Sequence, residues 1–85
     1  MKILYSSKFL RAYKKLPRDI KLLAEKKEII FRKNPFDKRL GAHKLHGSLK
    51  DFWSFSVDAR YRIVFELGDG DEIYFHTVGD HDVYK

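Results

Sequence analysis

Apolar residues follow a helical period in the first third of the chain and a period of two in its second half. Phe9, Tyr13 and Leu16 fall at spacings of four and three residues, which predicts one buried stripe on a helix over residues 6–16. Pro17 ends that helix, and a second stripe predicts another helix over residues 18–33. We therefore expect an antiparallel pair of helices joined by a short turn.

The period of two indicates a β-hairpin between residues 52 and 67. A three-residue turn, Asp58-Ala59-Arg60, places Phe55 opposite Ile63, so that apolar side chains share one face. A two-residue turn would instead set Phe55 opposite Arg62 and mix the two faces. The longer turn is therefore favoured, and it directs Ser54, Ser56 and Arg62 to the face turned away from the helices.

Two further strands complete the predicted sheet. Residues 2–6 are typical of an edge strand, whereas residues 72–78 are apolar on both faces, as in a central strand. A short additional strand is possible in the segment HKLH, residues 43–46. The predicted fold is α+β in the order β-α-α-β-β-β, with two antiparallel N-terminal helices on one face of a mostly antiparallel, twisted sheet. Residues 1–85 are expected to form a single domain with the other face partly open.

Charge divides the chain more sharply than hydrophobicity does. Residues 1–50 hold fifteen basic and four acidic side chains, whereas residues 51–85 hold three basic and eight acidic ones. The basic excess favours a polyanionic or acidic partner, although lysines that merely solvate helix faces explain it equally well. There is no cysteine, and no stretch is long and apolar enough for a membrane span, so we expect a cytoplasmic protein.

The segment HKLHGSLKDFWSFSVDARYRIVFEL and the ending VGDHDVY, together with the order of elements, resemble the RelE/ParE superfamily of toxins from type II toxin–antitoxin pairs. The resemblance covers almost the whole chain and is closest to the RelE and YafQ branch. It implies a RelE-like fold and a ribosome-dependent mRNA endoribonuclease that inhibits translation. In that reaction the ribose 2′-hydroxyl attacks the adjacent phosphate, and no metal is needed. Two alternatives are a ParE-like inhibitor of DNA gyrase and an inactive binding protein with the same fold.

The resemblance also implies catalytic residues. Arg62 matches the strand arginine that contacts the scissile phosphate, a role suited to a permanently charged, bidentate guanidinium. His81 matches the histidine of the YafQ-type ending and is the best candidate for the general acid, because imidazole titrates near neutral pH. Tyr84 matches a terminal aromatic residue that stacks or supplies a hydroxyl, and His43 matches a histidine before the L-x-G motif.

Five further residues are expected to bind the substrate: Lys44, His46, Lys50, Ser56 and Arg60. The lysines match backbone-binding lysines of RelE-type members, and one of His43 and His46 is expected to face RNA. Ser56 and Arg60 stand where YafQ-like members have a histidine and an aspartate. The general base therefore stays open between His43, His46 and a lysine, and the alternative is a RelE-like mechanism that rests on charge rather than on a matched acid–base pair.

His76 lies in the last predicted strand, and a four-residue GDGD loop would place it opposite Ile63 on the helix side, in a structural role. The four histidines lack the spacing of metal ligands, so neither a metal nor another cofactor is expected. The resemblance implies a cognate antitoxin that folds on binding, together with the ribosome and mRNA, as partners. DNA would be contacted only through the antitoxin complex, and no membrane association is expected.

Overall fold

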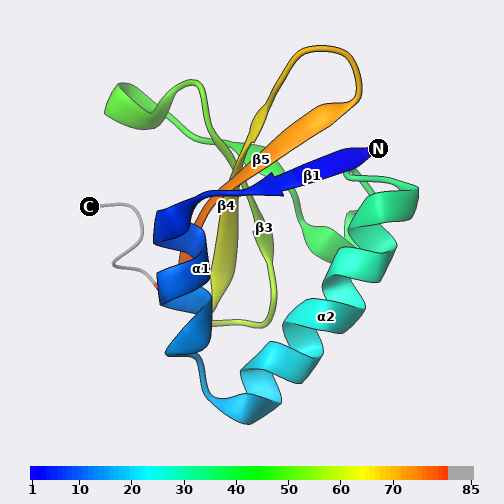
Figure 1. Cartoon of the computed structure of the whole chain (residues 1–85). Coiled ribbons are helices and arrows are strands. Elements are labelled where there is room, and N and C mark those ends of the chain that lie inside the picture. The colour runs from blue at the N-terminus through cyan, green and yellow to red at the C-terminus, as the bar shows by residue number, and fades with distance from the viewer. Residues whose placement is uncertain (81–85) are drawn as a thin grey trace.

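The computed structural model describes residues 1–80, which fold as a five-stranded sheet with two helices on one face (Figure 1). Along the sheet the strand order is β1-β5-β4-β3-β2, with β1 parallel to β5 and the other pairs antiparallel. This arrangement confirms the predicted α+β fold, including the short extra strand. The elements are β1 (Lys2–Tyr5), α1 (Ser7–Lys14), α2 (Arg18–Lys33), η1 (Lys38–Leu40), β2 (His43–Lys44), η2 (Gly47–Leu49), β3 (Trp53–Ser56), β4 (Arg62–Leu67) and β5 (Glu72–Gly79).

The two helices begin where the sequence predicts and run in roughly opposite directions, splaying apart from their connection at Pro17 (Figure 1). The Ser6 hydroxyl caps α1 by accepting a hydrogen bond from the Phe9 amide at 2.9 Å. Helix α1 is shorter than predicted and ends at Lys14, although Leu16 beyond it is still buried. Pro17 occupies the cap position of α2 rather than its first turn.

Four phenylalanine rings form the centre of the core between α2 and the sheet. The Phe31 ring lies 4.9 Å from that of Phe55, 5.0 Å from that of Phe65 and 5.3 Å from that of Phe75, measured between centroids. All four side chains have no exposed surface. Trp53 is only half-buried and lies at the periphery, edge-on to the exposed Phe36. The core is therefore built from one helical and three strand positions that the two periodicities had identified.

The hairpin register is confirmed: Phe55 pairs with Ile63, and Ser56 pairs with Arg62 across β3 and β4. The register of β5 differs from the prediction. Leu67 pairs with Ile73, so the loop is one residue longer than GDGD, and a β-bulge then interrupts the ladder at His76. Ile63 consequently pairs with Val78, and the expectation that His76 lies opposite Ile63 on the helix side is wrong.

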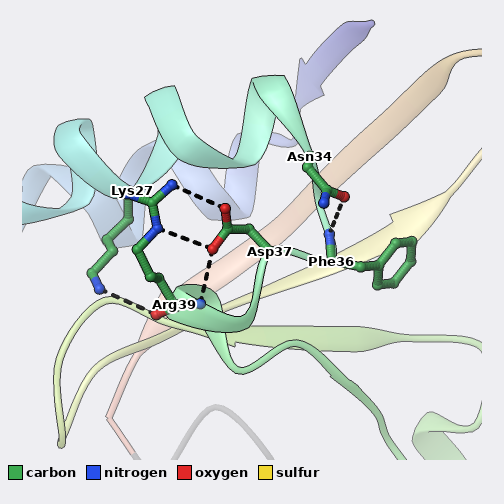
Figure 2. Close-up of polar contacts among 5 residues, drawn as sticks. All are labelled: Lys27, Asn34, Phe36, Asp37 and Arg39. Carbon is green, nitrogen blue, oxygen red and sulfur yellow. Dashed lines mark hydrogen bonds and ion pairs between the residues drawn. The ribbon is translucent and has the colours of Figure 1, made fainter.

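Polar contacts fix the loop that connects α2 to β2 (Figure 2). The Asp37 carboxylate accepts two hydrogen bonds from the Arg39 guanidinium, at 3.0 and 2.9 Å, and a third from the Arg39 amide. The side-chain hydrogen bonds from Arg39 lower the pKa of Asp37 to about 2. Lys27 of α2 donates to the Arg39 carbonyl at 3.4 Å, so this loop is tied to the helix before it delivers residues 41–43 to the sheet.

Candidate functional site

Arg62 begins β4 on the face of the sheet opposite the helices, as the hairpin register predicts. Its guanidinium donates a hydrogen bond from Nη1 to the Ser56 hydroxyl across the β3–β4 pair, at 2.9 Å. Both side chains are half-buried, so one side of the guanidinium is held by protein. Such a cation, fixed on a rigid strand, is suited to grip an oxyanion with its other N–H donors.

His43 is brought to the same face of the sheet by the loop that precedes β2. It pairs with Ser54 of β3, which places its side chain on the face of Arg62, and its Nδ1 lies 3.3 Å from the Gly41 carbonyl oxygen. Gly41 has a φ of +58°, and a Cβ at this position would lie 3.8 Å from the Ser56 hydroxyl. A glycine in the left-handed region thus lets the loop pass beside Ser56. Gly41 is therefore the loop residue beside Ser56, and His43 lies on the Arg62 face in the next row, level with Ser54.

Of two other predicted residues, Arg60 lies next to this corner in the sequence and Lys44 lies on the other face of the sheet. Arg60 ends the β3–β4 turn, where its guanidinium lies 5.7 Å from the centre of the Tyr61 ring and is exposed. The turn is closed by the Asp58 carboxylate, which accepts hydrogen bonds from the Arg60 and Tyr61 amides. Lys44 pairs with Trp53, so its position in β2 belongs to the helix face, and the structure does not bring it to Arg62.

His46 and Lys50 lie at the other end of β3. His46 is outside strand β2 and caps η2, while Lys50 ends that short helix, and both are exposed. Four residues of strand separate Phe52, at this end, from Ser56, which corresponds to about 13 Å. These two cations are therefore too distant to touch the same phosphate as Arg62.

His76 is the residue that the sequence placed wrongly and that the structure adds to this face. Its ring packs on that of Phe52 with 4.8 Å between centroids, which joins the η2 loop to β5. Burial lowers the pKa of His76, nearby Lys8 lowers it further, and Glu66 acts in the opposite direction. The error came from the loop before β5, which is one residue longer than the predicted GDGD turn, and the sequence contains no signal that selects the longer loop.

The middle of the face opposite the helices is less open than expected. Ser54, Val64 and Thr77 occupy successive strands in one row and are buried. The accessible chemistry is consequently divided into an Arg62 end and a His76 end, with this row between them.

Two predicted catalytic residues, His81 and Tyr84, lie outside the described residues. Within residues 1–80, no group of three or more histidine, aspartate or glutamate side chains is arranged to hold a metal ion. In the same part of the chain, neither helix is long and apolar enough to cross a membrane.

No protein-family model matches the sequence, and none of the curated proteins matches it either. Solved structures do match. YafQ from E. coli strain BL21(DE3) superposes with a TM-score of 0.80 at 20% identity, over 98% of this chain and 96% of that chain. A YoeB/ParE toxin from Agrobacterium tumefaciens gives 0.79 at 18% identity, over 95% and 99%. The E. coli DinJ-YafQ toxin-antitoxin complex gives 0.69 at 21% identity, over 96% and 93%. The chain therefore has the RelE-like fold of the YafQ, YoeB and ParE toxins over nearly its whole length.

Proposed function

We propose that this protein is the toxin of a type II toxin–antitoxin pair and cleaves mRNA on the ribosome by metal-independent attack of a ribose 2′-hydroxyl. The observation that carries the proposal is the Arg62–Ser56 pair on the helix-free face, with His43 on the same face. A fold shared with several toxins supports the general assignment, whereas the cleavage reaction is argued from this corner.

Cleavage by a 2′-hydroxyl needs three contributions: removal of a proton, stabilisation of extra charge on phosphorus, and protonation of the leaving 5′-oxygen. Arg62 supplies the second, because a guanidinium stays charged and offers paired N–H donors to phosphate oxygens. His43 is our choice among the candidate bases, because its place in β2 puts it on the Arg62 face, one row from Arg62. His81 is proposed as the acid and Tyr84 as a base-stacking or hydroxyl-bearing partner, by resemblance.

The remaining predicted contacts form a path for RNA along the face. Arg60 borders the Arg62 end, and His46 and Lys50 border the η2 end. Cations at both ends suit a single strand whose backbone passes across the face, since phosphate contacts position nucleic acid without reading its sequence. Lys44, on the helix face of β2, is proposed to contact a neighbouring part of the ribosome or message instead.

A protein antitoxin is the proposed regulatory partner, because one of the matched structures is the E. coli DinJ-YafQ toxin-antitoxin complex. The basic excess of residues 1–50 suits an acidic antitoxin segment that folds on binding. DNA would be reached only through that complex, and the proposed place of action is the cytoplasm.

The test is expression in bacterial cells with the 5′ ends of all messages mapped. In-frame cuts within translated regions are expected for the wild type, and Arg62→Ala should lower cleavage by about 10²–10³-fold, as for the loss of one oxyanion donor. Arg62→Lys is the matched control, because it keeps the charge but not the bidentate fork, and intermediate activity is expected. Arrested replication with intact messages would replace this proposal with gyrase inhibition, and undiminished cleavage in Arg62→Ala would remove Arg62 from the reaction.

A further inference from the structure

A hollow of about 420 Å³ opens beside β5, at the other end of β4 from Arg62. Its volume falls within the about 300–1,000 Å³ typical of sites for small molecules. The lining includes Leu4, Ser6, Glu66, Tyr74 and His76. Glu66 pairs with Tyr74 across β4 and β5, which puts both side chains on the same face as the Ser56–Arg62 pair. The hollow therefore lies on the proposed RNA-binding face.

His76 lines this hollow as the bulged residue of β5. The β-bulge inserts His76 as an extra residue between the pairs Phe65–Phe75 and Val64–Thr77. Ser6 holds the bulge, because its amide donates to the Phe75 carbonyl at 3.1 Å and its hydroxyl donates to the His76 carbonyl at 2.7 Å. His76 follows Tyr74 by two residues, so strand alternation places the imidazole on the face of Arg62, and the bulge reverses the faces only from Thr77 onward.

The separation between the two ends matches a short stretch of RNA. Arg62 pairs with Gly79, and His76 precedes Gly79 by three residues on β5, a distance of about 10 Å along the strand. A nucleotide whose phosphate lies at Arg62 would thus have a neighbouring base near His76. Beyond it, the ring of Phe52 continues the surface toward Lys50.

The polar groups around the hollow are mostly acceptors. The Glu66 carboxylate offers two oxygens and forms none of the ion pairs found among residues 1–80. The Tyr74 hydroxyl already donates its proton to Glu72 at 3.0 Å, which leaves only its lone pairs. The His76 imidazole, neutral near pH 7 because burial and Lys8 lower its pKa, offers one donor and one acceptor. A carboxylate reads adjacent N–H donors, and guanine presents two on its Watson–Crick edge.

We infer that the hollow is a nucleobase subsite that selects guanine next to the cleaved bond, with Glu66 accepting from the N1–H and N2–H groups and His76 contacting the base edge. This inference rests on the proposed nuclease function. It assigns codon preference to β4 and β5, apart from the Arg62 corner that performs the chemistry.

The experiment measures cleavage of ribosome-bound messages that differ only in the base at each position of the tested codon. The wild type is expected to prefer guanine at one position by about 10-fold, as one good bidentate contact supplies. Glu66→Gln should remove most of that preference, since an amide presents only one acceptor oxygen. His76→Phe should weaken the same preference while keeping the ring contact with Phe52. Asp69→Asn, in the exposed loop before β5, is the matched control and should leave the preference unchanged.

The outcomes separate the two proposals. A wild type that cleaves, with Glu66→Gln keeping the same guanine preference, overturns the subsite and leaves the nuclease function standing. An equal loss of rate on every codon in both variants also overturns it, because base reading changes rates selectively. A wild type that cleaves no message on ribosomes overturns the nuclease function and the subsite together.

Discussion

Replacing Ser56 by alanine tests whether this hydroxyl acts through Arg62. The hydrogen bond from Arg62 Nη1 to Ser56 Oγ is 2.9 Å long and joins two half-buried side chains. A hydrogen bond to a charged group contributes about 1.5–3 kcal/mol, and partial exposure reduces this to about 1–2 kcal/mol. If the bond holds the guanidinium in its reactive orientation, Ser56→Ala should lower kcat/KM for message cleavage by about 5–30-fold.

The assay is single-message cleavage on purified ribosomes, run as a double-mutant cycle with Arg62→Ala. Ser56→Ala should cost little or nothing once Arg62 has been removed, because the hydroxyl then has no guanidinium to hold. Ser56→Thr keeps a hydroxyl at the same strand position and should restore most of the activity. Equal losses from Ser56→Ala in both backgrounds would refute the positioning role, and thermal unfolding of each variant checks that the fold is intact.

Two further predictions concern stability and titration. Phe31→Ala should lower the free energy of unfolding, measured by urea denaturation, by about 3–5 kcal/mol, because it removes a ring that contacts three others in the core. The control is Phe36→Ala, an exposed position, which should lower it by about 1 kcal/mol. Similar losses for both variants would contradict this core. The NMR titration midpoint of His76 should lie below the ordinary 6.5, and Lys8→Gln should raise it. On acidification the unfolded chain protonates His76 at a higher pH than the folded chain does. The free energy of unfolding should therefore decrease as the pH falls through 6.5, and His76→Phe should lack this part of the decrease.

The fold could be predicted from the sequence because the helical and strand periodicities agreed with the positions of the prolines and turns. Pro17 and Pro35 bound the helical stripe closely enough that α2 spans the predicted residues 18–33. In the hairpin, only one turn length kept the apolar residues on one face, so the pairing of Phe55 with Ile63 could be derived before any coordinates. Local preference and global burial pointed to the same answer at these positions.

Only the part of the candidate site that depends on the hairpin register could be predicted from the sequence. Arg62 and Ser56 follow from the register, and their hydrogen bond is a direct consequence of it. The bulge at His76 has no such signature, because Phe75, His76 and Thr77 are compatible with an uninterrupted strand. Tertiary contacts select the bulge. Ser6 donates hydrogen bonds to carbonyls of β5, and the bulge lets Val78 pack into the core at the same time. One inserted residue then reverses the face of every later side chain in β5, which sequence alternation alone does not reveal.

The distribution of charge gives the proposed function two separable parts. Most of the basic residues of the first fifty belong to α1 and α2 and the loops around them, on the side of the sheet away from Arg62. Long-range attraction to a polyanion such as the ribosome depends on this summed charge and weakens with salt. The Arg62 face sets the Arg62 guanidinium on the same strand and face as the Glu66 carboxylate, so its field is mixed and short in range. If the proposed function holds, affinity for the ribosome should come mainly from the helices, and the Arg62 face should orient one phosphate and select its neighbouring base.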